Sequence, residues 1–317
     1  MKAYNFKNSS EYREFYKDKG YVVFKKLIPE KKVDNLLVSL ENFKRKRLPY
    51  YSQSIHNWIQ PELDKNGYMI ESMENPTRLL FNCGLGNSSK NILLGEEINS
   101  ALKIINPNFN NFVQWNNMLF DKSVGTMDHA DSFFLDTWPN GNLCAAWVAL
   151  EDIDEKSGPF KVYPKSHKLF LDKTYEGESL EEHFKFCADY IQTANFELAL
   201  LKKGDVLFWH PSLVHGALEQ EDPKYSRKSL TSHYYPLGVA KRGSENAAIN
   251  RPNHLKQFYN FLFRQPPKKF KNYEIYIDVF RVDSARWYIN GLKKLAQNKL
   301  SKKVSARYDI RRKSYEN

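Results

Sequence analysis

A histidine and an aspartate separated by one residue, His129 and Asp131, form the pair in this chain best suited to chemistry. In an extended strand, residues i and i+2 point to the same face, so the pair aims an imidazole and a carboxylate at one point. A histidine from a later strand, His215, would complete a set of two histidines and one carboxylate. Three such ligands leave coordination positions open, which is typical of non-haem Fe(II) oxygenases. Arg227 adds a fixed cation for a co-substrate that carries a carboxylate.

Each of these residues also has an ordinary structural interpretation when it is taken alone. His129 and Asp131 can form a surface pair, His215 can be a buried core histidine, and Arg227 can belong to a salt bridge. The order of the residues along the chain favours the catalytic interpretation, because several predicted strands separate the first pair from His215 and Arg227 falls near the next one. Ser229 shares the strand face of Arg227 and is placed to donate a hydrogen bond beside the guanidinium.

The elements that must position these side chains are mostly short strands. Turns containing Gly and Pro separate them, and this pattern favours a β-sandwich or barrel over alternating strand–helix units. The predicted strands are residues 112–120, 143–150, 160–163, 196–201, 206–209 and 228–235.

Helices are predicted mainly before and after these strands. Asn8 and Gly20 are placed to begin and end a first helix, a strand follows at 21–24, and Pro29 opens a second amphipathic helix. Residues 48–92 lack periodicity and are interpreted as a long covering loop with short helical pieces. Ser179 with Glu182 predicts a capped helix inserted among the strands.

Length and composition limit the class of protein. The 317 residues, 41% of them hydrophobic, are enough to build a large core, and no apolar run is long enough for a transmembrane helix. Three scattered cysteines predict neither a disulfide framework nor a zinc site. The first residues show no apolar signal segment, so a reducing, cytoplasmic location is expected.

The net charge of +11 is concentrated near the C-terminus, because residues 264–317 carry 15 Lys and Arg against 5 Asp and Glu. Such a segment can attract an anionic substrate, although a solvated helical face is the simpler interpretation. No zinc finger, RNA-binding or helix-turn-helix pattern accompanies the charge, so nucleic-acid binding is not expected.

Three stretches of the chain together resemble the phytanoyl-CoA dioxygenase family. They are residues 127–150, the run Ser-Gly-Pro-Phe-Lys-Val-Tyr-Pro-Lys-Ser-His-Lys at 157–168, and residues 204–227. The run Gly-Tyr-Val-Val-Phe at 20–24, followed by Pro-Glu, is similar to the family's opening. The likeness extends over roughly residues 8–236.

The resemblance implies a mainly β fold with helical decoration around a double-stranded β-helix, which is a cupin-like jelly roll. We expect a single domain over residues 1–317. Its parts would be N-terminal helices and a cover loop (about 1–110), the jelly-roll core (about 111–236), a helical insertion in that core (about 168–195) and a basic helical extension (about 237–317).

The resemblance also assigns roles to individual residues. It makes His129, Asp131 and His215 the ligands of Fe(II), and Arg227 the partner of the distal carboxylate of 2-oxoglutarate. Further co-substrate contacts are expected from five residues: Ser229, Gln114, Asn116, Thr126 and Trp147.

This sequence departs from the family pattern at two places. Ala217 stands where the family often has serine two positions after the distal histidine, so Ser229 or Thr231 would have to supply that hydroxyl. Lys165 replaces the glycine of a Pro-Gly-Ser-His turn. Asp131 is present, whereas related halogenases have Ala or Gly there to make room for chloride, and this favours oxygenation.

The sequence therefore predicts a dioxygenase that uses Fe(II), 2-oxoglutarate and O2. It would oxidise an unactivated C–H bond of a small, polar or anionic metabolite, mostly by hydroxylation, with desaturation or oxidative cyclisation as other outcomes. Two further classes stay open at this point: a cupin-like metalloenzyme that does not use 2-oxoglutarate, and a binding protein without activity. The oligomeric state is not predicted.

Overall fold

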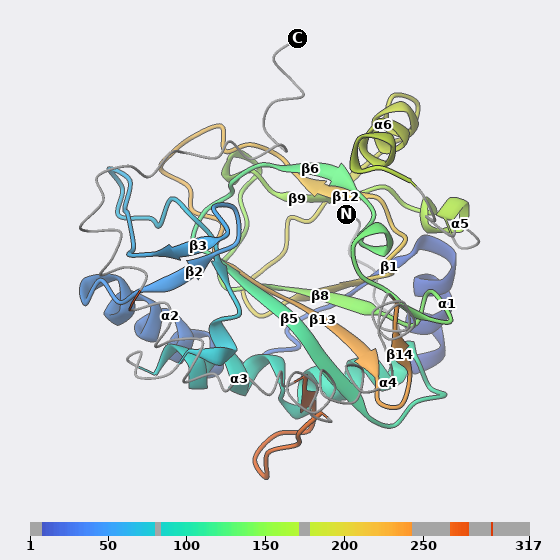
Figure 1. The fold of residues 1–317 in the computed structure, drawn as a ribbon, viewed down its shortest axis with the longest axis horizontal. Coiled ribbons are helices and arrows are strands. Elements are labelled where there is room, and N and C mark those ends of the chain that lie inside the picture. The colour runs from blue at the N-terminus through green and yellow to red at the C-terminus, as the bar shows by residue number, and fades with distance from the viewer. Residues whose placement is uncertain (1–7, 80–83, 171–177, 243–266, 279–292, 294–317) are drawn as a thin grey trace, which may run out of the picture.

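Two facing β-sheets dominate the computed structural model, which describes residues 8–79, 84–170, 178–242, 267–278 and 293 (Figure 1). In these residues the larger sheet has nine strands, in the order β1 (Tyr21–Phe24), β11 (Val206–Trp209), β8 (Cys144–Ala149), β13 (Ser229–Pro236), β5 (Phe112–Phe120), β4 (Met73–Glu74), β2 (Tyr50–Ser52) and β3 (Asn57–Ile59), with β15 (Tyr276–Ile277) beside β5. The smaller sheet runs β10 (Glu197–Leu198), β9 (Phe160–Val162), β12 (His215–Ala217) and β6 (Thr126–His129). Strands β7 (Thr137–Trp138) and β14 (Ala240–Lys241) form a separate ribbon.

Helices cover the face of the large sheet that is turned away from the small sheet (Figure 1). They are α1 (Ser9–Lys19), α2 (Glu30–Arg45), α3 (Leu85–Leu93) and α4 (Glu96–Ile105). Helices α5 (His167–Phe170) and α6 (Leu180–Ile191) lie beside the small sheet, and the 3-10 turns are η1 (Pro76–Arg78), η2 (Asp131–Phe133) and η3 (Glu155–Ser157). None of the helices in the described ranges is long and apolar enough to cross a membrane.

The large sheet is buried on both faces, as strand β8 shows. Cys144, Ala146 and Val148 pack into the core beneath the helices, whereas Ala145 and Trp147 pack into the core between the two sheets. Because successive side chains of a strand alternate between faces, both sets must be apolar. This is why the strand appears in the sequence as an unbroken hydrophobic run.

The predicted helix boundaries match side-chain caps in the structure. The Asn8 side chain accepts hydrogen bonds from two backbone N–H groups of the first turn of α1. Gly20 ends that helix with φ +81°, a left-handed conformation that glycine adopts without strain. Ser179 and Glu182 form the expected reciprocal capping box of α6.

The strand predictions succeed at residues 21–24, which form β1, and along the large sheet, but they miss the strands within residues 48–92. Residues 112–120 and 206–209 match β5 and β11, whereas of residues 196–201 only Glu197–Leu198 form a strand. The covering loop predicted over 48–92 contains the expected short helical pieces, η1 and α3, but the prediction missed the strands β2, β3 and β4. Strands β2–β4 join the large sheet through β5, and β1 and β15 extend it as well, so the sheet is wider than residues 111–236.

Other expectations need correction or lie beyond the described residues. Asp131 does not lie in a strand: β6 ends at His129, and Asp131 begins the 3-10 turn η2. Ala130 between them is extended, with φ −109° and ψ 130°, so the expected alternation still holds. The helix predicted in the C-terminal extension lies outside the described residues except at Lys293, and the part described at 267–278 contains β15.

Candidate active site

Two histidines on neighbouring strands of the small sheet lie directly opposite one another. His129 at the end of β6 pairs in register with His215 at the start of β12, and their ring centroids are 4.4 Å apart. Asp131 brings its Oδ1 within 3.6 Å of His129 Nε2 and 3.7 Å of His215 Nε2. One ligand atom from each residue lies within 4.8 Å of the others, which suits a single metal ion.

Backbone carbonyls fix the tautomer of both histidines. His129 Nδ1 lies 2.7 Å from the carbonyl oxygen of Met127, and His215 Nδ1 lies 2.8 Å from that of Leu213. A carbonyl only accepts, so each Nδ1 carries the hydrogen and each Nε2 presents its lone pair to the metal position. Burial lowers the pKa of His215 to about 4, which keeps this imidazole neutral as a ligand must be.

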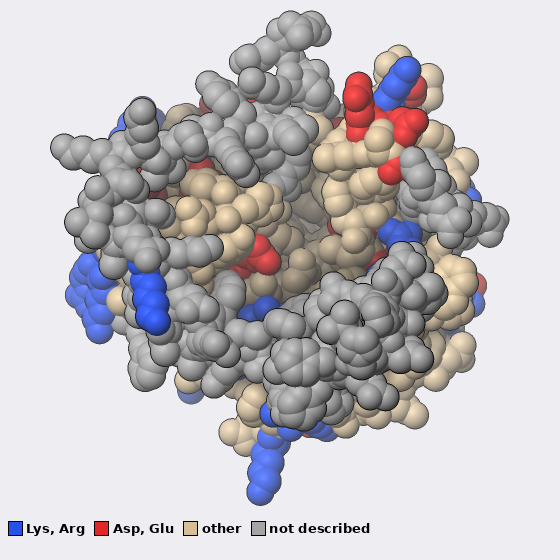
Figure 2. All heavy atoms as spheres, viewed as in Figure 1, with Lys and Arg blue, Asp and Glu red and all other residues tan. Residues whose placement is uncertain are grey.

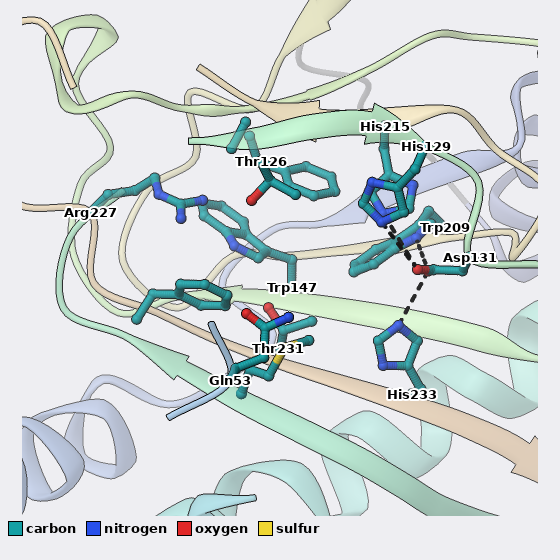
Figure 3. Close-up of a pocket in the computed structure, with 14 residues that line it drawn as sticks. Gln53, Thr126, His129, Asp131, Trp147, Trp209, His215, Arg227, Thr231 and His233 are labelled. Carbon is teal, nitrogen blue, oxygen red and sulfur yellow. Dashed lines mark hydrogen bonds and ion pairs between the residues drawn. The ribbon is translucent and has the colours of Figure 1, made fainter. Parts of the chain in front are cut away.

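The two carboxylate oxygens of Asp131 have different partners. Oδ1 faces the two histidines, whereas Oδ2 accepts hydrogen bonds from Trp209 Nε1 at 2.9 Å and from His233 Nε2 at 3.2 Å (Figure 3). Burial by itself would raise the pKa of Asp131, but His215 and His233 beside it hold that pKa well below its usual range. The group is therefore an anionic ligand at neutral pH.

A cavity extends from this triad toward Arg227. Figure 2 shows the hollow on this face of the molecule, and Figure 3 shows the side chains that point into it. It is lined by Gln53, Met118, Phe120, Thr126, His129, Asp131, Trp147, Phe160, Trp209, His215, Ala217, Arg227, Thr231 and His233. Four of these residues are large aromatics and eight are polar or charged, a combination that suits a small molecule with polar groups.

Arg227 is a buried cation, only 2% exposed, at the end of the cavity away from the triad. Among the described residues no carboxylate lies within ion-pair distance of its guanidinium, whose carbon sits 5.2 Å from the centroid of Phe120 and 5.9 Å from that of Trp147. Burial lowers its pKa to about 10. A buried charge without a partner is costly, so the position calls for an anion.

Three buried polar atoms near this cation have no hydrogen-bond partner within the described part of the chain: Arg227 Nε, Trp147 Nε1 and Ser229 Oγ. The first two belong to residues that line the cavity, and Ser229 shares its strand face with Thr231. Arg227 Nε and Trp147 Nε1 fit the distal carboxylate of 2-oxoglutarate, whose other end would meet a metal held by the triad, whereas Ser229, a predicted contact, does not line the cavity.

Of the remaining residues predicted to contact the co-substrate, one lines the cavity and two do not. Thr126 lines the cavity. Asn116 does not line it but contacts His233, with Asn116 Oδ1 2.6 Å from His233 Nδ1. Gln114 bonds to Thr77 and Ser232 instead, away from the cavity.

An irregularity in strand pairing explains why Asn116 and Gln114 diverge. Ser232 pairs with Asn117 but Tyr234 pairs with Gln114, so β5 contains one residue more than β13 at this point. Such a bulge re-aims the side chains that follow it, and strict alternation along the strand fails. Nothing in the sequence pattern indicates this bulge.

Several cavity residues were not predicted as site residues. Gln53 follows β2, in the stretch interpreted as a loop, and nothing in its sequence surroundings marks it. His233 had one usable signal, because its spacing from Thr231 and Arg227 places all three on one strand face. Trp209 precedes the His-Pro-Ser run that leads to His215, and its indole contact with Asp131 needed the structure to be seen.

A jelly-roll sandwich with two histidines, one carboxylate and a lone buried arginine defines a non-haem iron oxygenase. The chain belongs to the phytanoyl-CoA dioxygenase (PhyH) family, whose model matches residues 16–229. Peroxisomal phytanoyl-CoA dioxygenase of Rattus norvegicus is 24% identical over 71% of this chain and 68% of its own length. The Homo sapiens protein of the same name is 22% identical over 71% of this chain and 67% of its own.

Solved structures share the fold. The carbocyclase SnoK from nogalamycin biosynthesis has a TM-score of 0.55 and 17% identity, covering 79% of this chain and 91% of its own. EctD from S. alaskensis, with 2-oxoglutarate and 5-hydroxyectoine, has a TM-score of 0.53 and 13% identity, covering 74% and 79%. The predicted mainly β, jelly-roll fold is confirmed.

Family membership selects among the three classes that the sequence left open. The chain is an Fe(II)/2-oxoglutarate-dependent dioxygenase, and it uses Fe(II), 2-oxoglutarate and O2. When bound, these supply the oxidising chemistry of the reaction. In this chain His129, Asp131 and His215 would hold the metal, and Arg227 at the far end of the cavity would face the co-substrate.

Proposed function

We propose that this enzyme hydroxylates an unactivated C–H bond of a small polar metabolite that carries a carboxylate or a phosphate. The observation that carries the proposal is the place of Asp131. Its Oδ1 faces both histidines, so a carboxylate fills the third ligand position, which a halide would need for halogenation. Oxygen transfer is then the outcome that the ligand set favours.

Two features support the proposed character of the substrate. The concentration of positive charge after residue 263 would attract an anion. Phe134, 49% exposed, packs edge-on against His129 with 5.8 Å between ring centroids. An apolar carbon of the substrate would be held against this ring, next to the metal, while its charged group stays in solvent.

Desaturation or oxidative cyclisation is the second candidate outcome. It is favoured by the structural likeness to SnoK, which is a carbocyclase. The departures from the family pattern at Ala217 and Lys165 do not distinguish hydroxylation from desaturation or cyclisation, because all of these reactions begin with removal of hydrogen from the same kind of bond. The mass of the product separates them.

The test starts with anaerobic binding of Fe(II) and 2-oxoglutarate to the purified protein. A panel of carboxylates, phosphates and acyl-CoA thioesters, phytanoyl-CoA among them, is then screened for succinate release coupled to a change in substrate mass. Gain of one oxygen supports hydroxylation, and loss of two hydrogens supports the second candidate. Asp131→Ala is the control that should abolish both signals. Turnover confined to neutral, uncharged compounds would contradict the proposed substrate class.

We also propose a cytoplasmic location, on the basis of the three scattered cysteines in the sequence. The mammalian relatives are peroxisomal by name. Fractionation of cells that express the full chain distinguishes the two compartments, and recovery with peroxisomes would contradict this proposal.

A further inference from the structure

The second oxygen of Asp131 is held by two donors that are not metal ligands. Trp209 Nε1 lies 2.9 Å from Oδ2 and His233 Nε2 lies 3.2 Å from it, in the buried floor of the cavity (Figure 3). A carboxylate only accepts, so His233 donates from Nε2 and that nitrogen is not free to bind a metal. His233 is accordingly absent from the group of residues that could share one ion.

His233 is itself held from its other side. Its Nδ1 lies 2.6 Å from the side-chain amide of Asn116 on β5. Each ring nitrogen of His233 therefore faces an oxygen atom, the carboxylate of Asp131 on one side and the amide of Asn116 on the other. The ring is thereby fixed between one amide and one carboxylate.

The bulge in β5 is what allows this contact. Pairing between β13 and β5 shifts between Ser232 and Tyr234, which is the stretch that contains His233. The shift turns Asn116 toward His233, whereas Gln114 bonds to Thr77 instead. Bulges of this kind are common next to active sites, where they aim one side chain.

We propose that His233 is a positioning residue that keeps Asp131 bound to the metal through Oδ1 alone. With Oδ2 occupied by two N–H donors, the carboxylate cannot rotate to offer both oxygens to the ion. One coordination position that a two-oxygen ligand would fill stays available to the co-substrates. This inference rests on the iron site and not on the identity of the substrate.

Two substitutions at this position separate hydrogen bonding from packing. His233→Gln keeps an N–H donor at about the reach of Nε2, whereas His233→Leu fills the space without a donor. The readouts are the dissociation constant for Fe(II) measured anaerobically, the visible spectrum of the Co(II)-substituted protein, and the charge-transfer absorption of the Fe(II)·2-oxoglutarate complex. Trp209→Phe removes the other donor and serves as a parallel case.

We expect His233→Leu to weaken Fe(II) binding by roughly 10- to 100-fold, the usual effect of losing a partner behind a metal ligand, and to change the Co(II) spectrum. His233→Gln should recover most of the affinity and the wild-type spectrum. His167→Gln, a change at another buried histidine outside the cavity, should leave both unchanged. Melting curves identify any variant that fails to fold, and Trp209→Phe then decides whether donors to Oδ2 control the spectrum.

The inference is overturned if His233→Leu binds Fe(II) as wild type does with the same Co(II) spectrum. It is also overturned if Gln and Leu lose affinity equally, because the role would then be packing. These results do not depend on turnover. A wild-type protein that binds Fe(II) and 2-oxoglutarate but oxidises none of the screened compounds would contradict only the proposed substrate.

Discussion

Replacing Arg227 with methionine tests the free-energy cost of burying a guanidinium in the site. Burial lowers the pKa of this guanidinium from its usual value to about 10. At 1.36 kcal/mol for each pKa unit, the ligand-free protein bears a desolvation cost of about 3 kcal/mol, an order-of-magnitude value. Methionine has a similar length and no charge, so Arg227→Met should unfold at a higher temperature than wild type when no co-substrate is present.

The same variant should lose most of its affinity for 2-oxoglutarate. Removing one partner of a buried charged pair costs about 3–5 kcal/mol, so the dissociation constant should rise by roughly two to three and a half orders of magnitude. The assay is anaerobic thermal unfolding of the Fe(II)-loaded protein over a range of 2-oxoglutarate concentrations. At about 100 times the dissociation constant, wild type should gain about 2.7 kcal/mol, and the variant should gain almost nothing at that concentration.

Arg227→Lys is the matched control, because it keeps the charge but loses the two-pronged geometry. It should bind 2-oxoglutarate with intermediate affinity. Two results would refute the reasoning. One is a methionine variant that binds 2-oxoglutarate within about threefold of wild type. The other is a ligand-free methionine variant that melts well below wild type, which would mean that the guanidinium already has a stabilising partner.

Three further predictions concern other parts of the molecule. Burial lowers the pKa of His210 to about 3, so this side chain stays neutral in the folded state while the unfolded chain takes up a proton below pH 6.5. His210 should therefore reduce the free energy of unfolding by about 1.4 kcal/mol per pH unit from there toward pH 3, in addition to the slope from other buried histidines such as His215. His210→Gln should make the pH dependence in urea titrations shallower by that amount, and a slope equal to that of wild type would disprove it. In Gly216→Ala the new Cβ would lie 2.5 Å from Asp128 Oδ1 and 2.7 Å from the Thr126 carbonyl oxygen, so β12 must move away from β6. We expect this variant to lose about 2 kcal/mol in the free energy of unfolding and to bind Fe(II) more weakly. Unchanged iron affinity would count against this prediction. Trp147→Phe removes an indole N–H that has no hydrogen-bond partner in the described part of the chain. Titration calorimetry should show the dissociation constant of 2-oxoglutarate raised about tenfold, with iron binding intact. An unchanged dissociation constant would place the co-substrate elsewhere.

The parts of the site that lie on regular strands could be predicted from the sequence. His129 and Asp131 were placed together by the alternation of an extended backbone, which persists through Ala130 although the strand itself has ended. His215 required pairing of β12 with β6, a long-range contact that sequence spacing permits but does not specify. The resemblance to the family supplied that step.

What could not be predicted depends on contacts between distant segments. The bulge in β5 changes the side on which Asn116 and Gln114 lie, and it exists only because β13 pairs beside it. Gln53 reaches the cavity because β2 joins the sheet through β4, where Ser52 pairs with Met73. These short strands have too few residues for periodicity to appear, and tertiary packing decides their structure.

The two sheets divide the active site between them. His129 and His215 belong to the small sheet, whereas Arg227 lies two residues before the start of β13 in the large sheet. A 2-oxoglutarate molecule held at both ends would connect the two sheets and resist their separation. Binding should slow amide exchange in strands of both sheets, including those that never touch the ligand. The resistance of the enzyme to proteolysis would then rise and fall with the supply of its own co-substrate.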